Sequence, residues 1–110
     1  MKNWLRKIAV VLFGFGQMAN ASDIPNFAET EQEAKQGNAA SQFNLGLMYY
    51  LGKGAPKDYK QAEHWFRRAA EQGDVDAQSN LGGLYYKGQG VAQDYEQAKY
   101  WFQKAAAQGF

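Results

Sequence analysis

Few side chains in this 110-residue sequence could carry out acid–base or nucleophilic chemistry. His64 is the single histidine and there is no cysteine, which excludes a histidine–cysteine metal cluster and a thiol nucleophile. Glu29, Glu31 and Glu33 could be proposed as a metal-binding or acid–base group, but on a helix only residues three or four apart face each other, so the three carboxylates do not all share one face. We therefore favour a solvated helix for the glutamates and a surface position for His64, and we expect no catalytic residue, metal site or cofactor.

The glycines of Asn80–Val91, NLGGLYYKGQGV, raise the possibility of a phosphate-binding loop. Such loops need a lysine–hydroxyl pair after the glycines, or a third glycine at the dinucleotide spacing, and this stretch has neither. It instead repeats Asn44–Ala55, NLGLMYYLGKGA, which lies 36 residues earlier. A segment present twice at a fixed spacing indicates architecture rather than a cofactor site.

The duplication extends over residues 38–73 and 74–109, where about half of the aligned positions are identical. A period in the thirties is typical of helical solenoids, in which each unit is one helix pair. Apolar residues fall at helical spacing in both halves of a unit. These sets are Ala77, Leu81, Leu84 and Tyr85 in the first half, Ala62, Trp65, Phe66 and Ala69 in the second, and Ala98, Trp101, Phe102 and Ala105 in its copy. The sequence predicts an all-α fold, an α/α superhelical solenoid of antiparallel helix pairs, with Trp65, Phe66, Trp101 and Phe102 in its core.

Helix boundaries recur with the same period. Side chains suited to N-caps stand at Asn26, Asn38, Asp58, Asp74 and Asp94, and glycines suited to helix ends at Gly37, Gly73 and Gly109. Gln61 and Gln97 follow their aspartates by three residues, as in a capping box. Asn26 with Glu29 resembles a further box, so residues 22–37 should form a partial repeat before repeat 1 (38–73) and repeat 2 (74–109).

Two glycines fall inside helices rather than at their ends. A helical glycine costs about 1 kcal/mol relative to alanine. Because Gly46 and Gly82 occupy the same position of both repeats, we expect another helix to pass too close there for a methyl group. The facing residue should be Ala62 or Ala98.

Residues 1–21 have the three parts of a secretory signal peptide: a basic start (MKNWLRK), a short apolar run (Ile8–Phe15) and small residues at Ala19–Ala21. The run is well short of the roughly 20 residues of a spanning helix, so we expect cleavage after Ala21, with an uncleaved anchor as the alternative. The formal charge is +1 for the whole chain and negative once the three basic residues of this segment are removed. We expect an exported protein, periplasmic or secreted, with no nucleic-acid partner and no stable membrane insertion.

The repeated residues resemble the Sel-1-like repeat, a relative of the tetratricopeptide repeat. The match rests on Asn-Leu-Gly-x-x-Tyr, Gly-x-Gly, Asp-Tyr, Ala-x-x-Trp-Phe, Ala-Ala and Gly, in two tandem copies. The resemblance implies an α/α superhelix that acts as a non-catalytic scaffold or adaptor for other proteins. Some secreted, cysteine-rich relatives are linked to β-lactam binding or hydrolysis. This sequence lacks their cysteines, so a β-lactam or cell-wall function is only the alternative hypothesis.

We expect the partner, a peptide or a folded protein, to bind the concave face built by the first helix of each repeat. The candidate contacts are Asn44, Asn80, Tyr50 and Tyr86. Self-association through repeat 2 is a further possibility, because about three repeats are normally needed to bury a continuous core.

A second apolar stripe, Phe43, Leu47 and Leu51, is present only in repeat 1. Its counterparts in repeat 2 are Ser79, Gly83 and Lys87. Either the short helix at residues 26–36 covers this stripe, or it forms an exposed groove that accepts a partner's helix or extended peptide.

Overall fold

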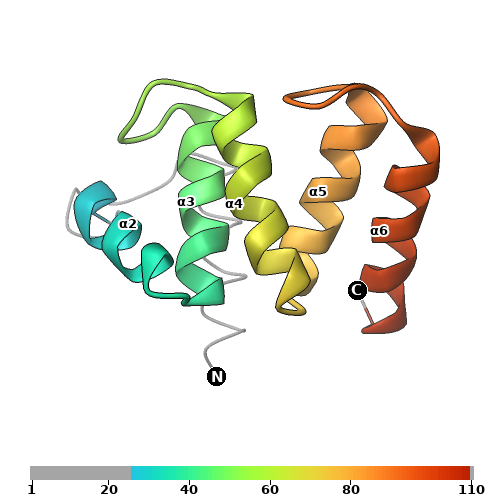
Figure 1. Ribbon diagram of the computed structural model, residues 1–110, viewed down its shortest axis with the longest axis horizontal. Coiled ribbons are helices and arrows are strands. Elements are labelled where there is room, and N and C mark those ends of the chain that lie inside the picture. Colours follow the sequence, from blue (N-terminus) through green and yellow to red (C-terminus); the bar gives the residue numbers. More distant parts are fainter. Residues whose placement is uncertain (1–25, 110) are drawn as a thin grey trace.

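The computed structural model describes residues 26–109, so the predicted signal peptide at residues 1–21 lies outside the described residues. The helices are α2 (Phe27–Lys35), α3 (Ala39–Leu51), α4 (Tyr59–Glu71), α5 (Val75–Lys87) and α6 (Tyr95–Ala107). Residues 26–109 contain no strand. The helices stand side by side in chain order, α2 at one end and α6 at the other (Figure 1). The predicted all-α solenoid is confirmed. None of these helices is long and apolar enough to span a membrane.

The helices begin at the predicted caps. Asn26, Asn38 and Asp74 each accept from one backbone N–H of the first turn, and Asp58 and Asp94 each accept from two. The reciprocal half of the predicted capping box is missing, because the Gln61 and Gln97 side chains are exposed and make no hydrogen bond within residues 26–109. Gly37, Gly73 and Gly109 follow their helices with positive φ, as predicted.

The main core lies between the two repeats. It joins residues from four helices: Phe43, Leu47, Ala62, Phe66, Ala69, Ala70, Ala77, Leu81, Leu84 and Trp101. A smaller cluster of Ala34, Leu45, Met48 and Trp65 joins α2 to repeat 1, with Phe27 and Tyr49 packed against it. The three inner helices, α3, α4 and α5, therefore each bury residues against the helix before and the helix after them.

The apolar stripe of repeat 1 lies inside this main core. Phe43 is fully buried, its ring centroid 5.7 Å from that of Phe66, and Leu47 is 7% exposed. For these two residues neither alternative holds: they form no open groove, and α2 packs on the other side of α3, against Leu45 and Met48. The physical reason is that the positions face α4 and α5 instead of the N-terminal helix. Leu51 is half-buried.

The helical glycines do mark a close approach, but the facing residue is an aromatic ring. A Cβ on Gly46 would lie 2.5 Å from Cδ1 of Phe66, and one on Gly82 would lie 2.8 Å from Cδ1 of Phe102. The prediction of Ala62 as the facing residue is wrong. Ala98 contributes only its carbonyl oxygen, 3.2 Å from that Cβ position. The phenylalanine comes one helical turn after the alanine and lays its ring over the glycine.

Candidate functional site

The surface that α4 and Tyr50 present toward the second repeat is a closed junction. The ring of Tyr50 lies 5.2 Å from that of Tyr59 and 6.5 Å from that of Phe66, measured between centroids. Its hydroxyl donates to Oε1 of Gln89, in the loop before α6, at 3.1 Å. Phe66 is 1% exposed, because the core residues of α5 cover it.

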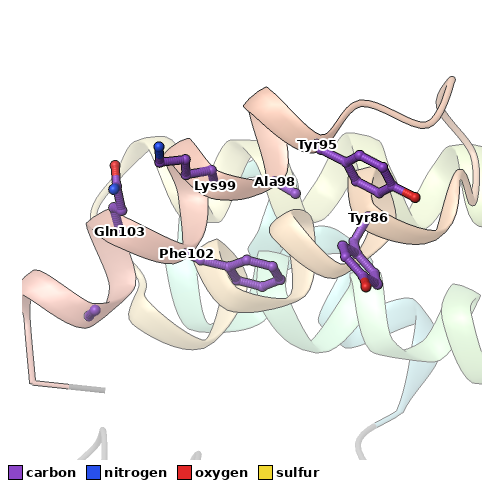
Figure 2. A pocket seen from close by; sticks show the side chains of 7 residues that line it. Tyr86, Tyr95, Ala98, Lys99, Phe102 and Gln103 are labelled. Atoms are coloured by element: carbon purple, nitrogen blue, oxygen red, sulfur yellow. The ribbon is translucent and has the colours of Figure 1, made fainter.

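The corresponding surface of repeat 2 is an open groove of about 450 Å³ along α6 and the end of α5 (Figure 2). We call it the α6 groove, and it is lined by Tyr86, Tyr95, Ala98, Lys99, Phe102, Gln103 and Ala106. Tyr86 is 56% exposed, and its ring lies 5.3 Å from that of Tyr95. Phe102 is 39% exposed. The core position predicted for Phe102 is therefore wrong, because no described helix follows α6 to cover it.

The polar rim also differs between the two repeats. In repeat 1 the Arg67 guanidinium donates to Glu63 at 2.7 Å and also hydrogen-bonds the hydroxyl of Tyr85 on α5. Burial alone would lower the pKa of Arg67, but the hydrogen bonds to Glu63 and Tyr85 outweigh it and raise that pKa. In repeat 2 Lys99 and Gln103 replace this pair. The rim of the α6 groove thus carries Lys99, which makes no ion pair within residues 26–109.

The predicted contact residues do not share one surface. Tyr50 faces the junction between the repeats, whereas Tyr86 faces the α6 groove. Asn44 and Asn80 are half-buried on α3 and α5. Oδ1 of Asn44 is buried without a hydrogen-bond partner among the described residues. The involvement of Asn44 and Asn80 in binding stays a prediction.

The residues considered for acid–base or metal chemistry lie on the surface or connect neighbouring helices. His64 is exposed and contacts Trp65 edge-on, with centroids 4.8 Å apart. Glu33 accepts from the Ser41 hydroxyl at 2.9 Å, which ties α2 to α3. Within residues 26–109, no group of three or more histidine or carboxylate side chains is placed to hold a metal ion.

A set of buried glutamines, which the sequence analysis did not single out, fixes how consecutive helices pack. Nε2 of Gln42 donates to the carbonyl of Ala34 at 3.0 Å, and Nε2 of Gln78 donates to that of Ala70 at 3.1 Å. Both glutamines are 1% exposed. Their own Oε1 atoms accept from Gln72 at 2.7 Å and from Gln108 at 2.8 Å. The signal that could have found them is the recurrence of both glutamines in each repeat.

These features define the class of structure, which is an α/α helical-repeat protein in which one unit packs on the next. Residues 39–74 and 75–110 each match the Sel1 repeat, so the chain belongs to the Sel1 repeat family. Proteins of this family generally mediate protein–protein interaction and are generally non-catalytic scaffolds.

Two curated relatives are similar over part of the chain. The secretory immunoglobulin A-binding protein EsiB of Escherichia coli O6:H1 strain CFT073 is 42% identical over 64 residues, which is 56% of this chain and 13% of EsiB. The ERAD-associated E3 ubiquitin-protein ligase component HRD3A of Arabidopsis thaliana is 40% identical over 45 residues, 40% of this chain and 7% of HRD3A. The chain thus spans only a small part of either relative.

Solved structures share the fold. A Sel1 repeat protein from Oxalobacter formigenes has a TM-score of 0.74 at 37% identity, covering 76% of this chain and 63% of the other. The protective antigen c5321 of uropathogenic Escherichia coli scores 0.75 at 46% identity, over 78% of this chain and 18% of that one. Cysteine-rich protein B of Helicobacter pylori scores 0.75 over 100% of this chain and 92% of that chain. Its 24% identity shows the fold alone.

Proposed function

We propose that this chain is a non-catalytic, exported adaptor that binds another protein through its helical repeats. The observation that carries the proposal is the match of both repeats to the Sel1 family, whose members generally bind proteins. The EsiB name supports a protein ligand, since it describes a protein that binds secretory immunoglobulin A.

Export is supported by the sequence of residues 1–21, with its basic start, apolar run and small residues before the expected cleavage point. A mature chain beginning near Ser22 would act in the periplasm or outside the cell. Its ligands would then be exported or surface proteins.

The α6 groove is the surface we favour for the contact. Tyrosine is enriched in protein interfaces, because its ring gives a large contact area and its hydroxyl can hydrogen-bond. Tyr86 is exposed, whereas the other six predicted contact residues are half-buried or buried. It lies beside Tyr95 and Phe102 in the groove. Tyr50, the matching residue of repeat 1, is already engaged with Gln89.

The test is capture of an exported or surface protein by the immobilised mature chain. Tyr86→Ala should reduce the captured amount several-fold, since it removes an exposed ring from the groove. Tyr100→Ala is the matched control, because Tyr100 is 50% exposed on α6 and does not line the groove. Capture that Tyr86→Ala leaves unchanged would argue against this surface.

Asn80→Ala, measured beside these variants, tests the predicted first-helix face separately. Asn80 lies on α5 outside the lining of the α6 groove. A loss of capture with Asn80→Ala but not with Tyr86→Ala would move the binding surface to the first helices.

A further inference from the structure

The α6 groove repeats a surface that already holds a helix elsewhere in the same molecule. Shifted by one repeat, its lining residues correspond to Tyr50, Tyr59, Ala62, Glu63, Phe66, Arg67 and Ala70. Tyr50 contacts both Tyr59 and Phe66 in that junction, and Tyr86 contacts Tyr95 in the groove. The apolar positions are identical in type, so the two surfaces differ in occupancy and in their polar rim.

The occupant of the repeat 1 surface is α5. Its buried stripe consists of Ala77, then Leu81 four residues on, then Leu84 seven residues on, and all are at most 2% exposed. These side chains pack in one cluster with Phe66 and Ala70. A helix with this stripe therefore fits a floor made of a phenylalanine and small alanines. The α6 groove offers such a floor in Ala98 and Phe102 (Figure 2), and Ala106 also lines it.

The hydrogen bonds of one backbone carbonyl on each surface independently support a helix of this kind as the occupant. The carbonyl of Ala70 accepts from the Gly73 N–H and also from Nε2 of Gln78, the residue directly after Ala77. The carbonyl of Ala106 likewise accepts from the Gly109 N–H, at 2.9 Å. Within residues 26–109 no side chain donates to this carbonyl as Gln78 donates to that of Ala70. An incoming glutamine placed as Gln78 is placed on repeat 1 would reach it.

The helices described within residues 26–109 offer no matching free face in a second folded copy. The equivalent face of α5 is buried against α4, and that of α3 is covered by α2, as the two core clusters show. The outward side of α2 is polar, with Glu29, Gln32 and Lys35 exposed. Among the described helices, none therefore has a free face of this kind with which to fill the groove of a second copy.

We propose that the α6 groove docks one amphipathic helix of another protein that presents the face of α5: alanine, glutamine directly after it, and leucines four and seven residues after the alanine. The first helix of a Sel1-type repeat in a partner has this chemistry. The inference rests on the proposed binding function and names the class of partner. Lys99 takes the place of the internally paired Glu63, so the groove favours a helix that is neutral or acidic along that rim.

The probe is a fluorescent peptide that copies residues 74–87. A side-chain lactam joining positions 79 and 83 holds it helical, because Gly83 has no atom within 4 Å of its Cβ position and Ser79 lies outside the buried stripe. Titration with the mature chain should give saturable anisotropy, and a peptide with Leu81→Asp should lose it.

Ala106→Lys is the decisive protein variant. Ala106 is exposed and lines the groove, so a lysine there fills the floor without removing a packed side chain. We expect peptide affinity to fall at least tenfold. Ala107→Lys is the matched control, adding the same charge at an exposed neighbour outside the groove, and should stay within twofold of the unsubstituted chain.

Three outcomes would overturn the inference. The first is no saturable binding of the peptide, and the second is an equal loss of peptide affinity in Ala106→Lys and Ala107→Lys. The third is a dimer of the unsubstituted chain in sedimentation that Ala106→Lys abolishes and Ala107→Lys does not. The last would identify a second copy as the occupant. Tyr86-dependent capture of a partner without peptide binding would reject the helix while the proposed function stands. Peptide binding without any captured partner would reject the adaptor function instead.

Discussion

The Phe66 ring lies against Gly46 so closely that a Cβ on the glycine would be 2.5 Å from Cδ1 of the ring. The same pair in repeat 2, Gly82 and Phe102, has a corresponding distance of 2.8 Å. The two phenylalanine rings differ in how freely they can move, since Phe66 is 1% exposed and Phe102 is 39% exposed. Identical sequence positions therefore have different tolerance for added volume.

Gly46→Ala should destabilise the chain. Overpacking a closed core costs about 1–3 kcal/mol, against a gain in helix propensity of about 1 kcal/mol. Gly82→Ala should cost less unfolding free energy than Gly46→Ala, because the Phe102 ring can turn toward solvent and only the Ala98 carbonyl, 3.2 Å from the Cβ position, stays close. Urea unfolding of both variants measures the difference, and equal destabilisation would show that repeat 2 is as tightly closed as repeat 1.

Gly83→Ala should stabilise the chain. Gly83 lies within α5, and nothing is within 4 Å of its Cβ position. An alanine there gains helix propensity of up to about 1 kcal/mol without meeting a neighbour. Thermal unfolding should show a raised midpoint, and a lowered midpoint would mean that the inner side of α5 is more crowded than described.

Gln78→Leu should destabilise the junction between the repeats. Gln78 is buried, donates to the Ala70 carbonyl and accepts from Gln108. Leucine keeps similar bulk but loses both hydrogen bonds, at a cost of about 1–3 kcal/mol. Chemical denaturation measures this cost, with Gln103→Leu as a control at an exposed glutamine. Similar losses in the two variants would mean that the buried hydrogen bonds contribute little.

Stability should fall in alkaline solution partly through Tyr49. Burial of its side chain raises the pKa of Tyr49 above 10.0, and the carboxylates of Glu31 and Asp58 raise it further. The folded chain holds the Tyr49 proton more tightly than the unfolded chain does. The contribution of this proton to the free energy of unfolding is therefore complete below pH about 10, and it is lost as the pH rises through the pKa of Tyr49 in the folded chain.

Tyr49→Phe removes that dependence while keeping the ring against Phe27. Between pH 8 and 10.5, its unfolding free energy should decline less than that of the unsubstituted chain. Tyr100→Phe, at a half-exposed position, is the control. A decline as steep in Tyr49→Phe as in the unsubstituted chain would count against the assignment.

Cleavage after Ala21 should yield a mature chain that begins at Ser22. The small residues at Ala19 and Ala21 fit the cleavage site of a secretory signal. Expression in a Gram-negative host, fractionation and mass measurement of the periplasmic product would show this start. A full-length product retained in the membrane fraction would favour the uncleaved anchor.

Most of the fold could be predicted because period, caps and apolar spacing all indicate the same helices. Asp58 and Asp94, for example, cap α4 and α6 as their positions predict. Local sequence could not show which helix each side chain would face. Phe43 fits an exposed stripe as well as a buried one until the position of α4 is known, and it is the neighbouring helix that buries it.

The candidate site was harder to predict for the same reason. Tyr50 and Tyr86 are the same residue at the same position of two repeats, yet one lies in a junction and the other beside an open groove. The two tyrosines differ only in the position of their repeat along the chain. The sequence predicts Phe102 in the core together with Phe66, although burial depends on the following helix rather than on the residue itself.

The unlike ends of the described array limit what its assemblies can become. One terminal helix, α2, shows solvent its charged side, while α6 shows an apolar one. Head-to-tail growth into filaments requires two complementary ends on each subunit, and the described residues offer one apolar end, at α6. If the proposed partner binds there, we expect a one-to-one complex whose size does not grow with concentration.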